Sequence, residues 1–364
     1  MSRQRTATAF AHAALALGMC AASGAWAQAV PGSSVTIYGL MDACVTSADL
    51  GTDRINGLNS GCLYGSRLGF RGTEDLGGGL RASFTLESGL TIDNGMLGQG
   101  GRMFGRKSLV SLSGGWGAVE LGRDYAPAFY VVQPIDPMAL GIGTASSTIW
   151  TGAASTTAAR NDNAMNLLSP TWGGLTIRLQ VAAGERGNNG SRNAQGVNML
   201  YRSGKTIAGL SHTRVANATN SDHDRATTVG ASHDFGAFSL AAIVQSGAWE
   251  GSRTAAAPSS ATSIFSRSYR SYLIGGSVRA GDVGKVNASL KRYDDRTARD
   301  FDATQFSVNY VYSLSRRTDL YAGYSRLRNE RASSYSVSDA TTAYSGVTPG
   351  ASTSLIATGI KHVF

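Results

Sequence analysis

The chain has 364 residues, a formal net charge of +9 at pH 7, 46 glycines and 7 prolines. Beyond its amino-terminal segment, no apolar run approaches the roughly 20 residues that a membrane-spanning helix needs, which excludes a helical membrane protein. Chains of this length usually fold as two domains, although a large β-barrel is a single one.

The amino-terminal residues 1–27 have the layout of a secretory signal peptide. Arg3 and Arg5 precede an alanine-rich apolar run from Ala7 to Ala22, which ends at the small-residue pattern Ala25-Trp-Ala27. The alternative, an amino-terminal membrane helix, is disfavoured because glycine and serine interrupt a run that is already short for a span. We therefore expect export, with residues 28–364 forming the mature domain.

Two of the three cysteines remain after such cleavage, because Cys20 leaves with the signal peptide. If a hairpin crosses residues 47–59, Cys44 and Cys62 lie opposite each other. A cross-strand disulfide suits an exported protein, and two free thiols are equally compatible with the spacing. A metal site is disfavoured because no histidine lies near these cysteines.

Alternation of apolar and polar residues is the recurring pattern along the chain. Leu175–Val181 places four apolar side chains on one face and Thr176, Arg178 and Gln180 on the other. The same period occurs in Phe306–Tyr312 and in Val286–Lys291. A β-sandwich alternates as well, so the connections between strands decide the architecture.

Short and long connections alternate strictly. Short connections rich in turn residues are expected at 75–79, 113–117, 169–174, 202–205, 234–237, 280–284 and 315–318. Longer polar connections are expected near 47–59, 91–102, 126–163, 184–195, 214–224, 247–267, 294–302 and 328–352. These fifteen connections predict sixteen antiparallel strands.

An outer-membrane β-barrel accounts for this asymmetry, because such barrels have tight turns on the periplasmic side and long loops outside. The last strand, Ser354–Phe364, ends on an aromatic residue and is a suitable partner for the first, Val35–Asp42. Their pairing would close the barrel and remove its open edges. Sixteen strands enclose a lumen too wide for side chains to fill, so we expect it to hold water.

The segment 126–163 is the longest connection, and it is rich in small residues. A long segment without regular structure is usually functional or disordered. In a wide barrel it can also fold inward and narrow the channel, which is the interpretation favoured here over a disordered external loop.

Several motifs along the mature chain resemble the general porins of Gram-negative bacteria, most closely the β-proteobacterial branch. The motifs are Ser34–Gly39 with Asp42, Gly65–Leu80, Phe104–Ser113, Leu121–Tyr125, Asn166–Gly174, Ser313–Thr318 and Gly359–Phe364. Together they cover nearly the whole mature chain in order. The second and the last of them are the most specific.

This resemblance implies a homotrimer of sixteen-stranded barrels in the outer membrane, each with its own pore constricted by the third external loop. Phe364 resembles the signal that the barrel-assembly machinery reads, and outer-membrane lipid and lipopolysaccharide are the expected surroundings. The resemblance also places three basic residues at the constriction. Arg67 matches through Ser-Arg-Leu-Gly, Arg106 through Phe-Gly-Arg, and Arg160 through its spacing from Asn166.

Strand alternation turns further arginines toward the lumen, since an arginine facing lipid at the bilayer midplane costs roughly 2–4 kcal/mol. The expected charged residues of the pore are Arg67, Arg71, Arg81, Arg106, Arg160, Arg178, Asp42, Glu87 and Asp136. Asp136 and Asp162 are the only acids between Tyr125 and Asn166. Guanidinium stays charged at any relevant pH, and rings of such charges select anions. We therefore expect small hydrophilic or anionic solutes to pass.

Other motifs are weak. The stretch Gly98–Arg102 vaguely matches a phosphate-binding loop but lacks the strand-turn-helix context, and the basic residues are too scattered for nucleic acid. The four histidines after residue 27 lie far apart, without the serine or aspartate partners of a catalytic site. We expect no catalytic residue, cofactor or metal. The alternatives are an outer-membrane enzyme, and a substrate-specific channel or surface adhesin that uses loops 247–267 and 328–352.

Overall fold

The computed structural model describes residues 34–142, 159–184, 193–216, 223–248, 268–296, 301–330, 333–342 and 344–364. The expected signal peptide, the middle of segment 126–163 and most of loop 247–267 lie outside these residues. None of the helices in the described ranges is both long and apolar enough to cross a bilayer.

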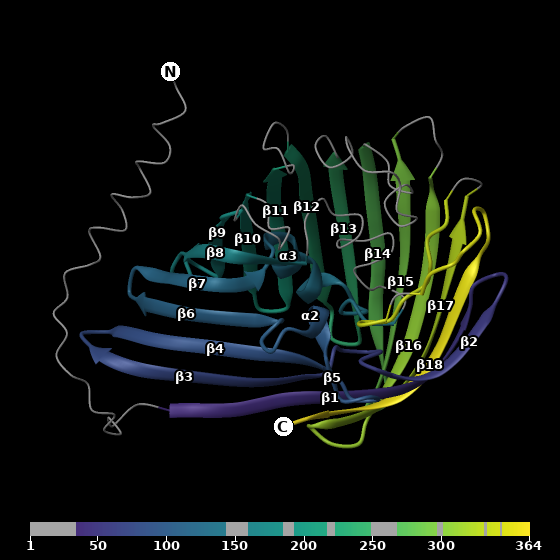
Figure 1. Ribbon diagram of the computed structural model, residues 1–364, viewed down its shortest axis with the longest axis horizontal. Helices are drawn as coiled ribbons and strands as arrows, with labels where there is room; N and C mark the ends of the chain where they lie inside the picture. The colour runs from purple at the N-terminus through teal and green to yellow at the C-terminus, as the bar shows by residue number, and fades with distance from the viewer. Residues whose placement is uncertain are drawn as a thin grey trace. The chain divides into compact units, whose positions relative to one another are not determined.

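The strands between Ser34 and Phe364 form a closed antiparallel barrel of sixteen strands (Figure 1). The wall strands are β1 Ser34–Asp49, β2 Arg54–Ser60 with β3 Arg67–Gly77, β4 Leu80–Thr91, β6 Lys107–Gly114, β7 Gly117–Tyr125, β8 Arg160–Leu168, β9 Leu175–Ala182, β10 Ala194–Ser203, β11 Thr206–Ala216, β12 His223–Asp234, β13 Phe238–Ala248, β14 Ser268–Ala280, β15 Gly284–Asp295, β16 Ala303–Ser313, β17 Thr318–Asn329 and β18 Thr353–Val363. β2 and β3 pair in succession with β1 and count as one wall strand. The short β5, Met96–Leu97, pairs only with the end of β4.

The first and last strands close the barrel, as the sequence predicts. β1 pairs with β18 from Leu40 opposite Val363 to Asp49 opposite Ser354, and the two strands lie side by side in Figure 1. The backbone of Gly39 exchanges hydrogen bonds of 3.0 and 3.1 Å with Phe364. A Cβ atom on Gly39 would lie 2.3 Å from the Phe364 ring, so glycine is needed where the terminal aromatic side chain packs.

The two faces of the wall have opposite chemistry. Large apolar side chains are exposed on the outer face, among them Val35, Ile37, Val110, Leu179, Ile274 and Leu290. Polar side chains alternate with them and are buried on the inner face, among them Asn166, Gln180, Gln245, Ser271, Gln305 and Ser325. This pattern is the reverse of a soluble protein and is typical of a barrel surrounded by lipid.

All seven expected short connections join neighbouring strands at one end of the barrel, which we call the turn end. The strand ends that the longer connections join lie at the other end, which we call the loop end. One expectation was wrong: residues 47–59 are not a loop. β1 continues to Asp49 and β2 begins at Arg54, so the connection is a tight turn in which the Leu50 N–H donates to the Asp53 carbonyl over 2.8 Å.

A disulfide joins Cys44 and Cys62, whose Cα atoms lie 6.1 Å apart. The register differs from the one expected, because Cys44 faces Asn59 and Cys62 follows the end of β2. The disulfide belongs to an apolar cluster that fills one side of the loop end. This cluster includes Tyr293, Leu327, Tyr335, Val337 and Leu355. The segment 333–342, which follows β17, therefore packs against the residues between β2 and β3.

The described start of segment 126–163 lies against the inner face. It contains α3, Pro127–Ile135, with proline at the first turn, where a missing N–H costs no hydrogen bond. Cβ atoms placed on Gly209, Gly275 and Gly323 would meet Val131, Pro137 and Ile142 respectively. Glycines on the wall thus make room for this segment along an arc from β11 to β17.

A buried ion pair holds the same segment to the wall. The Asp136 Oδ2 atom lies 3.5 Å from the Lys291 Nζ atom on β15, and their side chains are 0 % and 1 % exposed. The Asp136 carboxylate also accepts backbone hydrogen bonds from Met138, over 2.9 Å, and from Leu140, over 3.3 Å. Residues 143–158 lie outside the described part of the chain.

Burial raises the pKa of Asp339, in the segment between β17 and β18, from 3.8 to about 6. Its carboxylate accepts hydrogen bonds from the backbone of Thr341 and Thr342, which lower the pKa only in part. Since this pKa exceeds its value in an undocked segment, docking is strongest below about pH 4. It weakens as the pH rises through about 6, by up to roughly 3 kcal/mol.

We expect hydrogen exchange in residues 333–342 to slow as the pH falls from 7 to 4, after correction for the intrinsic exchange rate. An Asp339→Asn variant should lose this pH dependence while the barrel strands stay equally protected. Equal pH dependence in the variant and the parent would show that another group controls docking.

Candidate functional site

A cavity of about 380 Å³ opens at the loop end of the barrel, between the wall and α3. Its lining includes Arg67, Arg106 and Arg160, the three arginines expected at the constriction, together with Tyr64, Tyr125 and Gln133. None of the described residues that line it is an aspartate or glutamate. The cavity therefore collects positive charge without a carboxylate on its surface.

Arg106 immediately precedes β6 and is the most restrained of the three. Its Nε donates to Oε1 of Glu87 over 2.7 Å, and one terminal nitrogen donates to the Tyr125 hydroxyl over 2.8 Å. The Tyr38 hydroxyl donates to the other Glu87 oxygen over 3.1 Å. A Cβ atom on Gly65 would lie 3.0 Å from the Arg106 guanidinium, so glycine permits this close approach.

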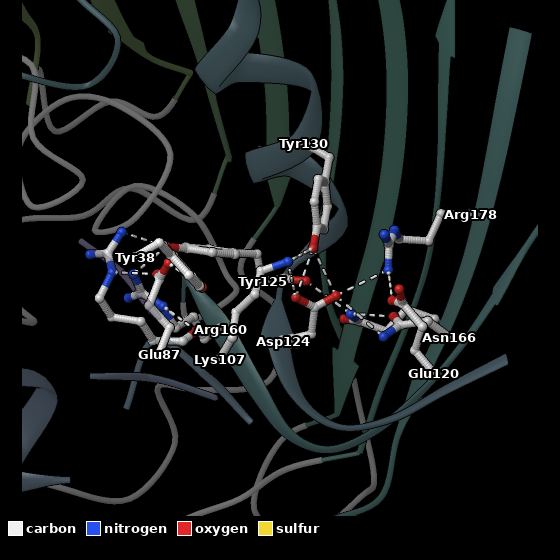
Figure 2. A network of polar contacts seen from close by, with 12 residues as sticks. Tyr38, Glu87, Lys107, Glu120, Asp124, Tyr125, Tyr130, Arg160, Asn166 and Arg178 are labelled. Carbon is white, nitrogen blue, oxygen red and sulfur yellow. Dashed lines mark hydrogen bonds and ion pairs between the residues drawn. The ribbon is translucent and has the colours of Figure 1, made fainter. Parts of the chain in front are cut away.

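Tyr125, the last residue of β7, joins Arg160 to Arg106. Its hydroxyl accepts a hydrogen bond from Arg160 over 2.9 Å (Figure 2). It accepts a second one from Arg106 over 2.8 Å. The Arg160 Cζ also lies 4.3 Å from the centre of the Tyr125 ring, which is a cation–π contact. Phe129 of α3 stacks on the Tyr125 ring, with 3.9 Å between the ring centres.

Arg67 begins β3 and completes the group. Its Nε atom is buried without a hydrogen-bond partner among the described residues, and its charge interacts with those of Arg106 and Glu87. Neither Arg67 nor Arg160 forms an ion pair with any other described residue. Glu87 pairs with Arg106 and interacts with Arg67, and no ion pair among the described residues offsets Arg160, so the group has surplus positive charge.

A second network beside the cavity is electrically balanced. Asp124 accepts hydrogen bonds from the Tyr130 hydroxyl, over 2.7 Å, and from Arg178, over 3.0 Å, and lies 3.2 Å from the Lys107 ammonium. Arg178 also pairs with Glu120 over 2.7 Å. Two cations thus face two carboxylates, and Tyr130 ties α3 to this part of the wall (Figure 2).

Comparison with known proteins gives the family. Residues 11–332 match the family described as Gram-negative porin. The chain belongs to the Gram-negative porins. It is 33 % identical to the outer membrane porin protein 32 of Delftia acidovorans, over 96 % of this chain and 99 % of that protein. It is 30 % identical to an outer membrane porin protein of Bordetella pertussis, over 82 % of this chain and 89 % of the relative.

Solved structures agree with this assignment. The anion-selective porin from Comamonas acidovorans superposes with a TM-score of 0.77 at 32 % identity, covering 91 % of this chain and 100 % of that one. The OmpT protein of Vibrio cholerae superposes with a TM-score of 0.67 at 13 % identity, which shows a shared fold alone. This porin is therefore an outer-membrane barrel, and its family consists of channels rather than enzymes.

Three other charged residues expected in the pore of this porin, Arg71, Arg81 and Asp42, have different surroundings. Arg71 packs with its Cζ atom 5.3 Å from the Tyr38 ring centre, and Arg81 faces Asp75 across β3 and β4 near the turn end. Asp42 is buried and accepts backbone hydrogen bonds from Leu63 and Tyr64 and one from the Tyr321 hydroxyl. None of these three charged groups lines the arginine cavity.

The two carboxylates expected in segment 126–163 are also paired with basic side chains. Asp136 pairs with Lys291, and Asp162 accepts hydrogen bonds from both Arg102 and Arg123. Neither carboxylate lines the arginine cavity, so neither offsets its charge at the surface.

Sequence reasoning missed Tyr125 and Lys107 as members of the site. Tyr125 closes the motif Leu121–Tyr125, and Lys107 directly follows Arg106, so both were visible in the porin-like stretches. Their roles depend on α3, which brings Tyr130 to the lysine over 3.0 Å. Alternation along a strand gives no information about such contacts from a loop.

Proposed function

We propose that this porin forms a water-filled channel for passive diffusion of small hydrophilic solutes, and that it prefers anions. The observation that carries this proposal is the cavity lined by Arg67, Arg106 and Arg160 without an acidic residue on its described surface. The acids nearby are already paired, and a surplus of guanidinium charge attracts anions. The anion-selective porin from Comamonas acidovorans, at 32 % identity, supports the same preference.

We also propose how the pore is constricted, assembled and oriented in the membrane. Segment 126–163 would fold inward and set the narrowest point, and its described start already contacts the inner face from β11 to β17. The channel would assemble as a homotrimer, with the apolar outer face against neighbouring subunits and lipid. The turn end would face the periplasm, as expected for tight turns in this kind of barrel.

The purified porin in planar bilayers is expected to insert in three equal conductance steps. In a potassium chloride gradient its reversal potential should lie on the side of the chloride equilibrium potential, because anions carry more of the current. A reversal potential on the potassium side would refute the anion preference. Block by one solute at low concentration would favour a substrate-specific channel instead.

A further inference from the structure

A second cavity, of about 540 Å³, lies at the turn end of the barrel. Its lining includes three basic side chains, Lys205, Arg279 and Lys285, and two acidic ones, Asp136 and Asp234. It shares Tyr64, Gln133 and Ala139 with the arginine cavity at the loop end. A solute that passes these three residues therefore moves from one basic cavity into the other.

The three basic residues come from two turns, one on each side of the turn between β12 and β13, and they line the same cavity. Arg279 on β14 and Lys285 on β15 are register partners, so their side chains share one face of the sheet. That face is the inner one, because the adjacent Val278 is exposed on the outer face while Ser277 is buried. Lys205, between β10 and β11, lies opposite Asp234, whose N–H donates to its carbonyl over 3.0 Å.

The charges of this cluster are not balanced locally. Like charges directly opposite each other in an antiparallel pair are destabilising, yet Arg279 and Lys285 occupy such positions. Among the described residues, neither they nor Lys205 form an ion pair. Asp136 is paired with Lys291, which leaves Asp234 as the carboxylate of the lining that interacts with all three cations.

A local arrangement that costs stability without compensation in the fold is expected at functional sites. The hydroxyl oxygens of Ser239 and Ser277 lie 2.6 Å apart beside these cations. Hydroxyl groups can donate hydrogen bonds to an oxyanion. Both residues line the same cavity. The chemistry present is that of a weak site for small polyvalent anions.

We infer that Lys205, Arg279 and Lys285 form a second anion station, which binds small polyvalent oxyanions at the turn end of the pore. This inference rests on the proposed anion-preferring channel and adds a specificity-determining site at the opposite mouth. The station raises the local concentration of anions at that mouth only. Selectivity and block are therefore asymmetric across the membrane.

The test is block of the chloride current by inorganic phosphate, added to each bilayer chamber in turn. In the parent porin, the half-blocking concentration from one chamber should be roughly five-fold lower than from the other. The triple variant Lys205→Gln/Arg279→Gln/Lys285→Gln should remove this difference. The parent difference should also shrink at about 1 M salt, where the screening length falls to roughly 3 Å.

The matched control is Arg316→Gln/Arg317→Gln, which removes two cations from another turn at the same end that lines neither cavity. Phosphate should block the chloride current of this control with the same difference between the two chambers as in the parent. The inference would be overturned if the triple variant kept the parent's difference in half-blocking phosphate concentration between the two chambers. It would also be overturned if the control variant changed that difference as much as the triple variant does. If the triple variant does not fold, Lys205→Gln alone should show the same direction of change.

Two readouts separate this inference from the proposed function. Loss of anion preference in the parent porin would overturn both, whereas an anion-preferring parent with symmetric phosphate block would overturn only the station. Arg279→Gln alone should not lower the unfolding temperature, since it relieves repulsion from Lys285. A lowered unfolding temperature would assign Arg279 a structural role instead.

Discussion

Replacing Arg67 and Arg160 together by glutamine is expected to lower the chloride-to-potassium permeability ratio of the porin by roughly ten-fold. Both guanidiniums line the arginine cavity and lack an ion-pair partner among the described residues. In water, a unit charge about 5 Å from an ion changes its energy by roughly 0.8 kcal/mol, or about four-fold per charge. Screening at about 0.1 M salt reduces the combined effect of two charges.

The measurement is the reversal potential in a potassium chloride gradient, and Glu87→Gln is the opposite-sign control. Glu87 pairs with Arg106 over 2.7 Å, so its removal frees a guanidinium and should raise the ratio. Arg106 itself is a poorer test, since its loss would leave Glu87 buried without its cation. A ratio unchanged in the double variant would place the selective part of the pore elsewhere.

The barrel could be predicted from the sequence because its signals are local and repeated. Alternation sets which side chains face lipid, and seven turn-rich connections mark the ends of strands. The failure at residues 47–59 has a physical cause. Asp49, Gly51 and Asp53 look like a loop, but they form only the tip of a hairpin whose arms, β1 and β2, are paired up to Asp49 and Arg54.

The site could be predicted only in part, because loops complete it. The motifs that hold Arg67 and Arg106 lie on strands, and the structure brings these residues to one cavity with Arg160. Arg178 lies on the expected inner face, yet Glu120 and Asp124 balance its charge. Which charges remain in surplus depends on contacts between distant strands and α3, and no short sequence pattern encodes those.

Replacing Lys291 by methionine is expected to release segment 126–142 from the wall. The change would leave Asp136 buried and without its cation, which typically costs about 3–5 kcal/mol. The segment would avoid this cost by moving away from β15, so that Asp136 reaches water. Single-channel recordings should then show a larger, noisier conductance with frequent closures, and the folded porin should unfold at a lower temperature.

The double variant Asp136→Asn/Lys291→Met should recover most of the parent conductance and stability. It removes both charges, and the asparagine oxygen can still accept the shorter of the two backbone hydrogen bonds, that from the Met138 N–H. Arg54→Met, which breaks the exposed pair with Asp49, should cost no more than about 1 kcal/mol. Equal behaviour of Lys291→Met and Arg54→Met would mean that the apolar contacts of Val131, Val132 and Ile135 alone hold the segment in place.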